Sequence, residues 1–144
     1  MFSKACEYAI RATIYVAEQS NLGKRVSLKE IAAAIDSPEA FTAKILQQLS
    51  RAEIIDSVKG PSGGFSIEKK KAHQLKIGKI VLAIDGDSIY KGCGLGFKEC
   101  SEKRPCPVHH KFKKVRDELR HMLETTSIYE LSKELEKGLT FLHR

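Results

Sequence analysis

Two short helical patterns, separated by only a few residues, constrain the fold of this chain more than any other feature. The stretch "SLKEIAAAI" opens with Ser27, and Glu30 follows three residues later. This spacing is a capping box, in which the hydroxyl and the carboxylate each satisfy an unpaired backbone N–H at the start of a helix. In the following stretch, "DSPEAFTAKILQQLSRAEII", Ser37 is suited to cap a second helix and Pro38 to occupy its first position. The sequence therefore predicts a helix-turn-helix.

The second predicted helix has one apolar face and one face of small and polar residues. The apolar positions recur at helical spacing and are Phe41, Ile45, Leu49 and Ala52. The other face carries Glu39, Thr42, Ala43 and Gln47. A helix that enters the major groove of DNA needs a free face of this kind. Pairs of helices that merely pack together show a similar pattern, so this motif alone leaves both interpretations open.

The segment after the helix pair predicts a β-hairpin. The strand-forming residues Ile54, Val58, Phe65 and Ile67 flank the turn sequence "GPSGG" at 60–64. A hairpin that follows a helix-turn-helix is a wing, and small residues at its tip allow close approach to a phosphate backbone. Residues 38–79 contain eight Lys or Arg against four Asp or Glu, and such charges hold phosphates without reading sequence. Lys59, Ser62 and Gly63 are therefore candidate DNA contacts.

The overall charge agrees with a polyanionic partner. The formal net charge is +7 and the pI is about 9.3, which favours nucleic acid or an anionic membrane surface. No stretch approaches the roughly 20 apolar residues that span a bilayer. Glu7 and Arg11 interrupt any apolar core of a signal peptide. We therefore expect no membrane association and a location in the cytoplasm, at the nucleoid, where thiols stay reduced.

Helices are also predicted on both sides of this region. Residues 3–20 and 75–87 have helical patterns, and Glu7 and Arg11 are spaced to pair in the first of them. A longer helix from residue 111 carries an apolar stripe of Phe112, Val115, Leu119, Met122 and Leu123, interrupted and recapped at "TTS" (125–127). This stripe is either a dimer seam or packs on its own domain. The expected architecture is mainly α with a small β-hairpin: a winged helix-turn-helix domain (1–88), a cysteine-rich loop (89–110), and a dimerisation helix with a C-terminal helix (111–144).

Three of the four cysteines lie in the stretch "KGCGLGFKECSEKRPCPVHHKFKK" at 91–114. They are Cys93, Cys100 and Cys106, and His109 follows the last of them by three residues. Gly, Pro and Lys dominate this stretch, so it is expected to be an irregular loop. Between residues 98 and 116 there are seven Lys or Arg against two Asp or Glu. Positive charge favours thiolate, the form of cysteine that ligates metal or reacts.

Several uses of this loop are compatible with its residues. Three thiolates could hold an iron–sulfur cluster if another group supplies a fourth ligand. Three cysteines and one histidine also suit tetrahedral zinc, although only Cys106 and His109 have the close spacing usual at zinc sites. Thiol sensing by oxidation and cysteines without a role are further alternatives. Cys6, on the apolar face of the first helix, is expected to be a small buried hydrophobe. No phosphate-binding loop, nucleophile elbow or HExxH pattern is present, so we do not expect an enzyme.

The order of these parts resembles a known family. A first helix "SKACEYAIRA", a capped helix-turn-helix, a wing "VKGPSGGF" and a three-cysteine loop ending "PCPVH" are similar to the Rrf2 family of winged helix-turn-helix transcription regulators, with its IscR-type, NsrR-type and CymR-type members. The resemblance covers nearly the whole chain. It implies a homodimeric bacterial regulator that binds double-stranded DNA at a palindromic operator. In cluster-binding members the three loop cysteines hold a 2Fe–2S or 4Fe–4S cluster.

The resemblance also implies roles for individual residues. Two candidates match the fourth cluster ligand: His109 from the same chain, as in IscR-type members, and Glu7 from the partner chain, in the acid-Tyr-Ala motif of NsrR-type members. The gap between Cys93 and Cys100 is one residue longer than expected for those members, which leaves the cluster type open. The implied base-reading residues are Glu39, Thr42 and Ala43, with Lys59 and Ser62 at the wing. Ser27, Gln47 and Gly63 complete the predicted DNA contacts, and zinc remains the alternative cofactor.

Overall fold

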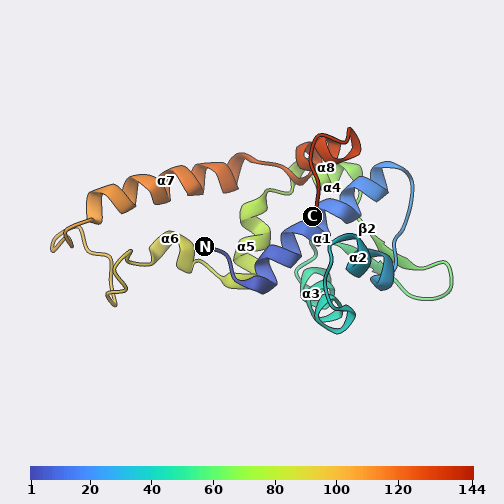
Figure 1. Ribbon diagram of the computed structural model, residues 1–144, viewed down its shortest axis with the longest axis horizontal. Coiled ribbons are helices and arrows are strands. Elements are labelled where there is room, and N and C mark those ends of the chain that lie inside the picture. Colours follow the sequence, from blue (N-terminus) through green and yellow to red (C-terminus); the bar gives the residue numbers. More distant parts are fainter.

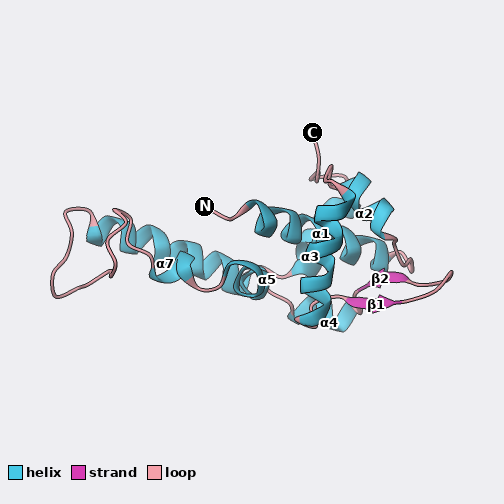
Figure 2. Ribbon diagram, turned by 90° about the horizontal axis from the view of Figure 1, so that it is seen from below, coloured by secondary structure: helices cyan, strands magenta, loops and turns pink.

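The structure is a computed structural model that describes residues 1–144, and it confirms the predicted mainly α class with a small β-hairpin. Its elements are α1 (Lys4–Asn21), α2 (Leu28–Ala34), α3 (Glu39–Arg51), β1 (Asp56–Val58), β2 (Gly64–Ser66), α4 (Lys69–Gln74), α5 (Ile77–Asp85), α6 (Ser88–Lys91), α7 (His109–Thr125) and α8 (Ile128–Glu136). Helices α1–α5, α8 and the hairpin form one body, from which α7 extends as an arm (Figure 1). The cysteine loop lies at the far end of this arm, opposite the wing, in both views (Figures 1 and 2).

The core is built around α1. Small side chains on this helix, including Cys6, Ala9 and Ala12, are fully buried, which lets α5 and α8 pack closely against it. The predicted burial of Cys6 is confirmed. Burial raises the pKa of the Cys6 thiol to about 12, and the nearby Asp85 carboxylate adds to this rise. Cys6 is therefore a packing residue whose thiol stays protonated.

The predicted helix-turn-helix is present, with differences at its helix starts. The Ser27 hydroxyl accepts a hydrogen bond from the Glu30 backbone N–H at 3.2 Å and donates to the Glu30 carboxylate at 3.2 Å, so only half of the predicted capping box forms. The predicted start of α3 is one residue early. Pro38 has extended backbone angles and occupies the N-cap position, and no side chain caps this helix. Ser37 instead contacts the hydroxyl of Thr42.

The wing forms as predicted. Strands β1 and β2 are antiparallel, with Ser57 opposite Phe65, and Phe65 also pairs with Val26 before α2. The hairpin is thereby attached to the helix pair by backbone hydrogen bonds of 3.1 and 2.8 Å. A Cβ atom at Gly63 would lie 2.0 Å from the carbonyl oxygen of Val58, so only glycine fits at this point of the turn.

Two short helices were not predicted, and one side-chain pair was predicted wrongly. Helix α4 begins in the lysine run that follows the wing, and α6 precedes the cysteine loop. Glu7 forms an ion pair with Lys4 at 3.4 Å rather than with Arg11. Arg11 donates instead to the carbonyl of Ile35 at 3.1 Å, because α1 packs beside the end of α2.

The arm is fixed to the body at only one end. The backbone N–H of Ile77 donates to the carbonyl of Thr126 at 3.1 Å, and the backbone N–H of Ile128 donates to the carbonyl of Leu75 at 2.8 Å. These bonds tie the junction between α7 and α8 to the start of α5. The predicted break and recapping at 125–127 are confirmed, because Ser127 and Glu130 form a complete capping box at the start of α8. No helix of the chain has the length and apolar character required to cross a bilayer.

Candidate cysteine site and nucleic-acid interface

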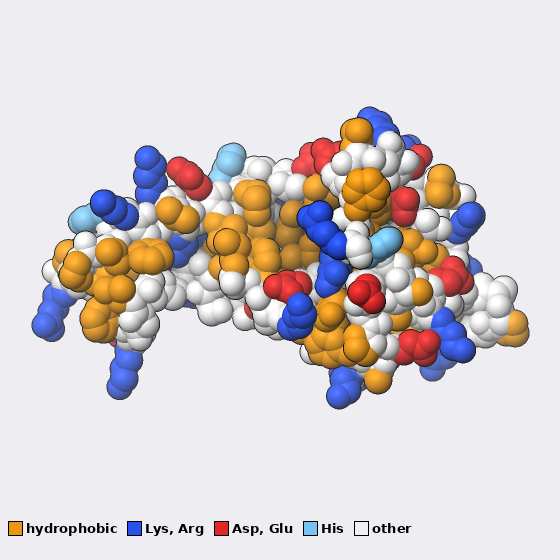
Figure 3. Space-filling model, in the orientation of Figure 1, with side chains coloured by type: hydrophobic (Ala, Val, Ile, Leu, Met, Phe, Trp, Pro, Cys, Tyr) orange, Lys and Arg blue, Asp and Glu red, His pale blue; other side chains and the backbone are white.

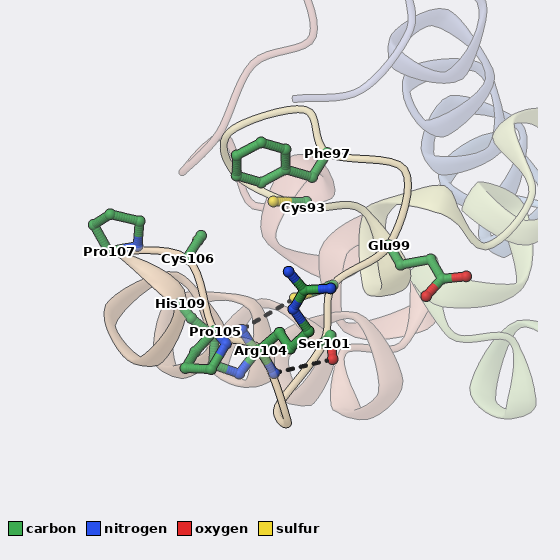
Figure 4. Close-up of a pocket in the computed structure, with 10 residues that line it drawn as sticks. Cys93, Phe97, Glu99, Ser101, Arg104, Pro105, Cys106, Pro107 and His109 are labelled. Carbon is green, nitrogen blue, oxygen red and sulfur yellow. Dashed lines mark hydrogen bonds between the residues drawn. The ribbon is translucent and has the colours of Figure 1, made fainter.

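The three loop cysteines and His109 line one hollow at the tip of the arm. The hollow has a volume of about 720 Å³, and Figure 4 shows Cys93, Cys106 and His109 around it. Helix α6 ends just before Cys93, while His109 is the first residue of α7, so the two helices hold the ends of the loop. All four cysteines are free thiols. The structure thus brings together four residues that the sequence spreads over 17 positions.

Cys100 lies near two nitrogen atoms of α7 side chains. Its Sγ lies 3.4 Å from Nδ1 of His109 and 3.6 Å from Nη2 of Arg116. His109 is only 3% exposed, and its other ring nitrogen, Nε2, is buried without a hydrogen-bond partner. A buried imidazole nitrogen normally has a partner, so this Nε2 is an orphaned polar atom of a residue that lines the hollow.

Cys93 lies in a backbone turn that favours its thiolate. The N–H of Leu95 donates to the sulfur at 3.4 Å. Hydrogen bonds from the backbone N–H of Leu95, and then of Phe97, lower the pKa of Cys93, with a smaller contribution from the Cys106 thiol. Backbone N–H donors of the loop therefore stabilise negative charge on the Cys93 sulfur.

The donor chemistry of the hollow fits an iron–sulfur cluster or a zinc ion. Three thiols are soft ligands of the kind that both groups take, and the imidazole with its orphaned Nε2 is a suitable fourth. No three His, Cys, Asp or Glu side chains are gathered around a single point, so the loop would have to tighten around a bound group. Glu99 also borders the hollow, but its carboxylate points away from the cysteines (Figure 4). Glu7 lies on α1 and is not part of the hollow.

Of the four predicted DNA contacts on α3, three are exposed, namely Glu39, Ala43 and Gln47. The prediction for Thr42 is corrected by its burial. Thr42 is 0% exposed and its hydroxyl donates to the carbonyl of Pro38 at 2.9 Å. Its position within the first turn, against the core, directs its side chain inward. Lys44 is exposed on the same helix and was not singled out from the sequence.

A second hollow lies between the wing and the turn that joins α1 to α2. Ser27, Ser62 and Gly63 line it together, although they come from different elements. Lys24, Arg25 and Lys69 line the same hollow. Lys69 belongs to the basic stretch already noted around the wing, whereas Lys24 and Arg25 were not identified from the sequence as contacts. The basic turn "GKR" was the available signal, but only the fold brings it beside the wing. Lys59 is exposed at the end of β1.

The arm exposes an apolar face. Val115 is 63% exposed, and Phe112 and Met122 on the same side of α7 and Leu82 on α5 are also exposed. Figure 3 shows hydrophobic side chains gathered over the arm and the adjoining part of the body. Leu123, by contrast, is fully buried where α7 joins the body. The predicted stripe is therefore divided between a residue that packs on its own domain and residues that remain uncovered in the single chain.

Comparison with known proteins agrees with this architecture. The family model Rrf2, described as an iron-dependent transcriptional regulator, matches residues 2–134. A protein of Aquifex aeolicus (strain VF5), described as an HTH-type transcriptional regulator, is 34% identical over 141 residues, which are 96% of each chain. The structure of CymR, the global cysteine regulator of B. subtilis, has a TM-score of 0.74 at 20% identity and covers 92% of this chain and 96% of that one.

A second solved structure, IscR of T. potens, has a TM-score of 0.73 at 18% identity and covers 97% of this chain and 91% of that one. At these identities the structural likenesses establish a shared fold. The family match over residues 2–134 and the 34% identity to the Aquifex protein establish kinship. The chain is a member of the Rrf2 family, and it is a DNA-binding transcriptional regulator rather than an enzyme.

Proposed function

We propose that this regulator acts as a homodimer on a palindromic operator and senses redox, nitric oxide or iron–sulfur status through an iron–sulfur cluster on the cysteine loop. The observation that carries the proposal is the single hollow lined by Cys93, Cys100, Cys106 and His109 at the tip of the arm. Among the relatives are proteins named NsrR and IscR, from Oceanobacillus iheyensis and Vibrio campbellii. When bound, such a cluster supplies one-electron redox chemistry.

The three thiolates are the proposed protein ligands of the cluster. His109 is favoured as the fourth, because its Nε2 is buried and lacks a hydrogen-bond partner. Glu7 of a second chain is the other candidate. Its side chain is exposed on α1 and its only ion pair, with Lys4, is a solvent-exposed one that costs little to break. The Cys93 turn and the Arg116 side chain would stabilise negative charge on the sulfurs in either case.

The proposed dimer seam is the apolar face of α7. Val115, Phe112 and Met122 repeat at helical spacing and are exposed in the single chain. Exposed apolar stripes of this kind are usually covered by a partner, and a second copy supplies the same stripe through a two-fold axis. Two copies would place their α3 helices about 34 Å apart, in successive major grooves of one face of DNA.

On each half-site, α3 is proposed to enter the major groove with Glu39, Ala43 and Gln47 toward the bases. Lys59, Ser62 and Gly63 of the wing and Ser27 at the start of α2 are proposed to contact the backbone. Lys24 and Arg25 add positive charge beside Ser27 in the same hollow. Since α7 carries the loop at one end and joins the body at the other, a change in the loop would alter the seam and so the spacing of the two α3 helices.

A cluster-free regulator of the same fold is the alternative. Cys106 and His109 have the close spacing of zinc ligands, and a backbone hydrogen bond of 3.0 Å from the His109 N–H to the Cys106 carbonyl already holds them close along the chain. A zinc ion held by three cysteines and His109 would staple the loop. Without any metal, the free thiols could sense oxidants directly.

The test is an absorption spectrum with iron, sulfide and zinc analysis on protein purified without oxygen. Broad visible absorption with matching iron and sulfide supports the cluster, and its loss in Cys100→Ser assigns it to the loop. Comparing His109→Ala with Glu7→Ala then identifies the fourth ligand. A colourless protein with stoichiometric zinc, or without metal, contradicts the cluster. Gel-shift titrations of loaded and metal-free protein on DNA fragments selected by the protein test whether DNA affinity responds to the bound group.

A further inference from the structure

Beyond the proposed ligands, one face of α7 contacts the cysteine loop at several points. His109, Phe112 and Arg116 are spaced three and four residues apart, so they lie on the same side of the helix. His109 and Arg116 both reach Cys100, Arg116 also reaches Gly92, and Phe112 lies against Gly94. This arrangement suggests that α7 fixes the shape of the loop before any group binds.

Arg116 connects the first segment of the loop, at Gly92 and Cys93, with the segment that contains Cys100. Its Nη1 donates to the carbonyl of Gly92 at 2.7 Å, and its Nη2 donates to Sγ of Cys100 at 3.6 Å. Gly92 immediately precedes Cys93, whereas Cys100 lies seven residues further along the loop than Cys93. One guanidinium group therefore fixes the distance between the first two cysteines, which are separated by the long six-residue gap.

Phe112 contacts the loop between those two points. A Cβ atom built at Gly94 would lie 2.4 Å from one carbon of the Phe112 ring and 2.5 and 2.6 Å from two others. Real Cβ atoms do not approach other atoms this closely, so a larger residue at position 94 would displace the Phe112 ring from its present position. Glycine at this position lets the segment that follows Cys93 lie against α7.

We propose that Arg116 is the positioning residue of the cysteine site, and that the Phe112–Gly94 contact sets the register of the same loop against α7. This inference rests on the proposed function, because it concerns the group that the three thiols would hold. A guanidinium suits this role, since its rigid fork can donate to two acceptors at once, whereas a lysine ammonium acts as a point charge. Its hydrogen bond to the Cys100 sulfur would also withdraw charge from that ligand and raise the reduction potential of a bound cluster.

The test compares Arg116→Gln with Arg120→Gln, a matched control one turn further along. Arg120 stacks over the ring of Tyr90 at 4.9 Å and has no hydrogen bond to the loop. The first measurement is amide hydrogen exchange of the metal-free chain over residues 92–100. We expect faster exchange at Leu95 and Gly96 in Arg116→Gln only, because their N–H groups bond to Cys93.

The second measurement is reconstitution with iron and sulfide. Arg116→Gln is expected to lose iron to a chelator about tenfold faster than the parent chain, as is typical when a partner of a metal ligand is removed. Its reduction potential is expected to fall, and Arg116→Lys to restore retention only in part. Unchanged exchange, retention and potential in Arg116→Gln would overturn the proposal. If the parent chain takes up no iron and sulfide, the proposed cofactor fails, and the exchange of the metal-free chain alone decides the role of Arg116.

The Phe112–Gly94 contact allows a rescue experiment. Gly94→Ala is expected to abolish reconstitution, because the new methyl group collides with the ring. The double variant Gly94→Ala/Phe112→Leu is expected to regain it, since the smaller and more flexible leucine leaves space for the methyl group. Gly94→Ala that loads as well as the parent chain, or a double variant that remains defective while Phe112→Leu alone loads normally, would contradict the proposed register.

Discussion

The hydroxyl of Thr42 donates a hydrogen bond to the carbonyl of Pro38 at 2.9 Å, inside the first turn of α3. Thr42 is buried and supports the start of α3, so we expect it to contribute to stability rather than to base reading. Thr42→Val keeps the shape of the side chain but removes the hydroxyl, and we expect it to lower the free energy of unfolding by about 1 kcal/mol. The sequences that the protein selects from a random duplex library are expected to stay the same. Urea denaturation and binding-site selection measure the two effects.

Two variants serve as controls for this prediction. Thr42→Ser retains the hydroxyl and should retain most of the hydrogen bond. Gln47→Ala removes an exposed side chain from the proposed groove-facing side of α3, so it is expected to change the selected sequences with little change in stability. A changed sequence preference in Thr42→Val, at normal stability, would return Thr42 to the base-reading set.

Lys59 is expected to contribute one phosphate contact at the wing. Lys59→Ala should weaken binding to all DNA sequences alike and reduce the slope of log K against log salt by about 0.9. Affinity titrations at several salt concentrations measure this slope. Lys137→Ala, which removes the same charge beyond the end of α8, is the matched control and should leave the slope unchanged. Equal slopes for Lys59→Ala and the parent chain would remove Lys59 from the contact surface.

Val115 tests the proposed seam. Val115→Glu places a charge in the middle of the exposed apolar face of α7, and an unpaired charge buried between two chains is strongly unfavourable. We expect the variant to sediment as a monomer at concentrations where the parent chain is a dimer. His121→Glu changes a residue on the opposite, polar side of α7 and should remain dimeric. A dimeric Val115→Glu would place the seam elsewhere.

The buried thiol of Cys6 should make the stability of the folded chain depend on pH. Its pKa is about 12 in the folded chain against 9.0 for a free thiol, so above pH 9 the unfolded chain loses a proton that the folded chain keeps. By linkage, this group makes stability fall as the pH rises from about 9 toward 12, whereas its contribution is fully present below 9. The stability difference between the parent chain and Cys6→Ala should therefore shrink between pH 8 and pH 10.

Thiol counting gives an independent check on Cys6. In the metal-free native chain at pH 8, a thiol reagent should modify three cysteines quickly and the fourth only after denaturation, because Cys6 is 0% exposed. Four fast thiols would show that the α1 face is not packed as described. The same count in Cys6→Ala should be three before and after denaturation.

Local patterns predicted most of the helices and the wing, because caps, helical spacing and turn residues act over a few neighbours. The start of α3 was misplaced because Ser37 has the local propensity of an N-cap, whereas in the fold its hydroxyl contacts Thr42 and Pro38 takes the N-cap position. Lys24 and Arg25 were missed because the turn that carries them meets the wing through Val26 and Phe65, which are 39 positions apart. The contacts of Arg116 could not be predicted for the same reason, since its acceptors lie 16 and 24 residues earlier in the chain.

The backbone bonds between Leu75–Ile77 and Thr126–Ile128 hold α7 to the body at its C-terminal end, while its N-terminal end carries the cysteine loop. Its 17 residues extend about 25 Å from this attachment. A rotation of about 5° at the attachment therefore displaces the cysteine loop by about 2 Å, and the relation holds equally in reverse. A displacement of the loop by a few ångströms therefore corresponds to a rotation of only a few degrees where α7 joins the body. In the proposed dimer, such a coupling would let a change in the loop alter the separation of the two α3 helices without unfolding either chain.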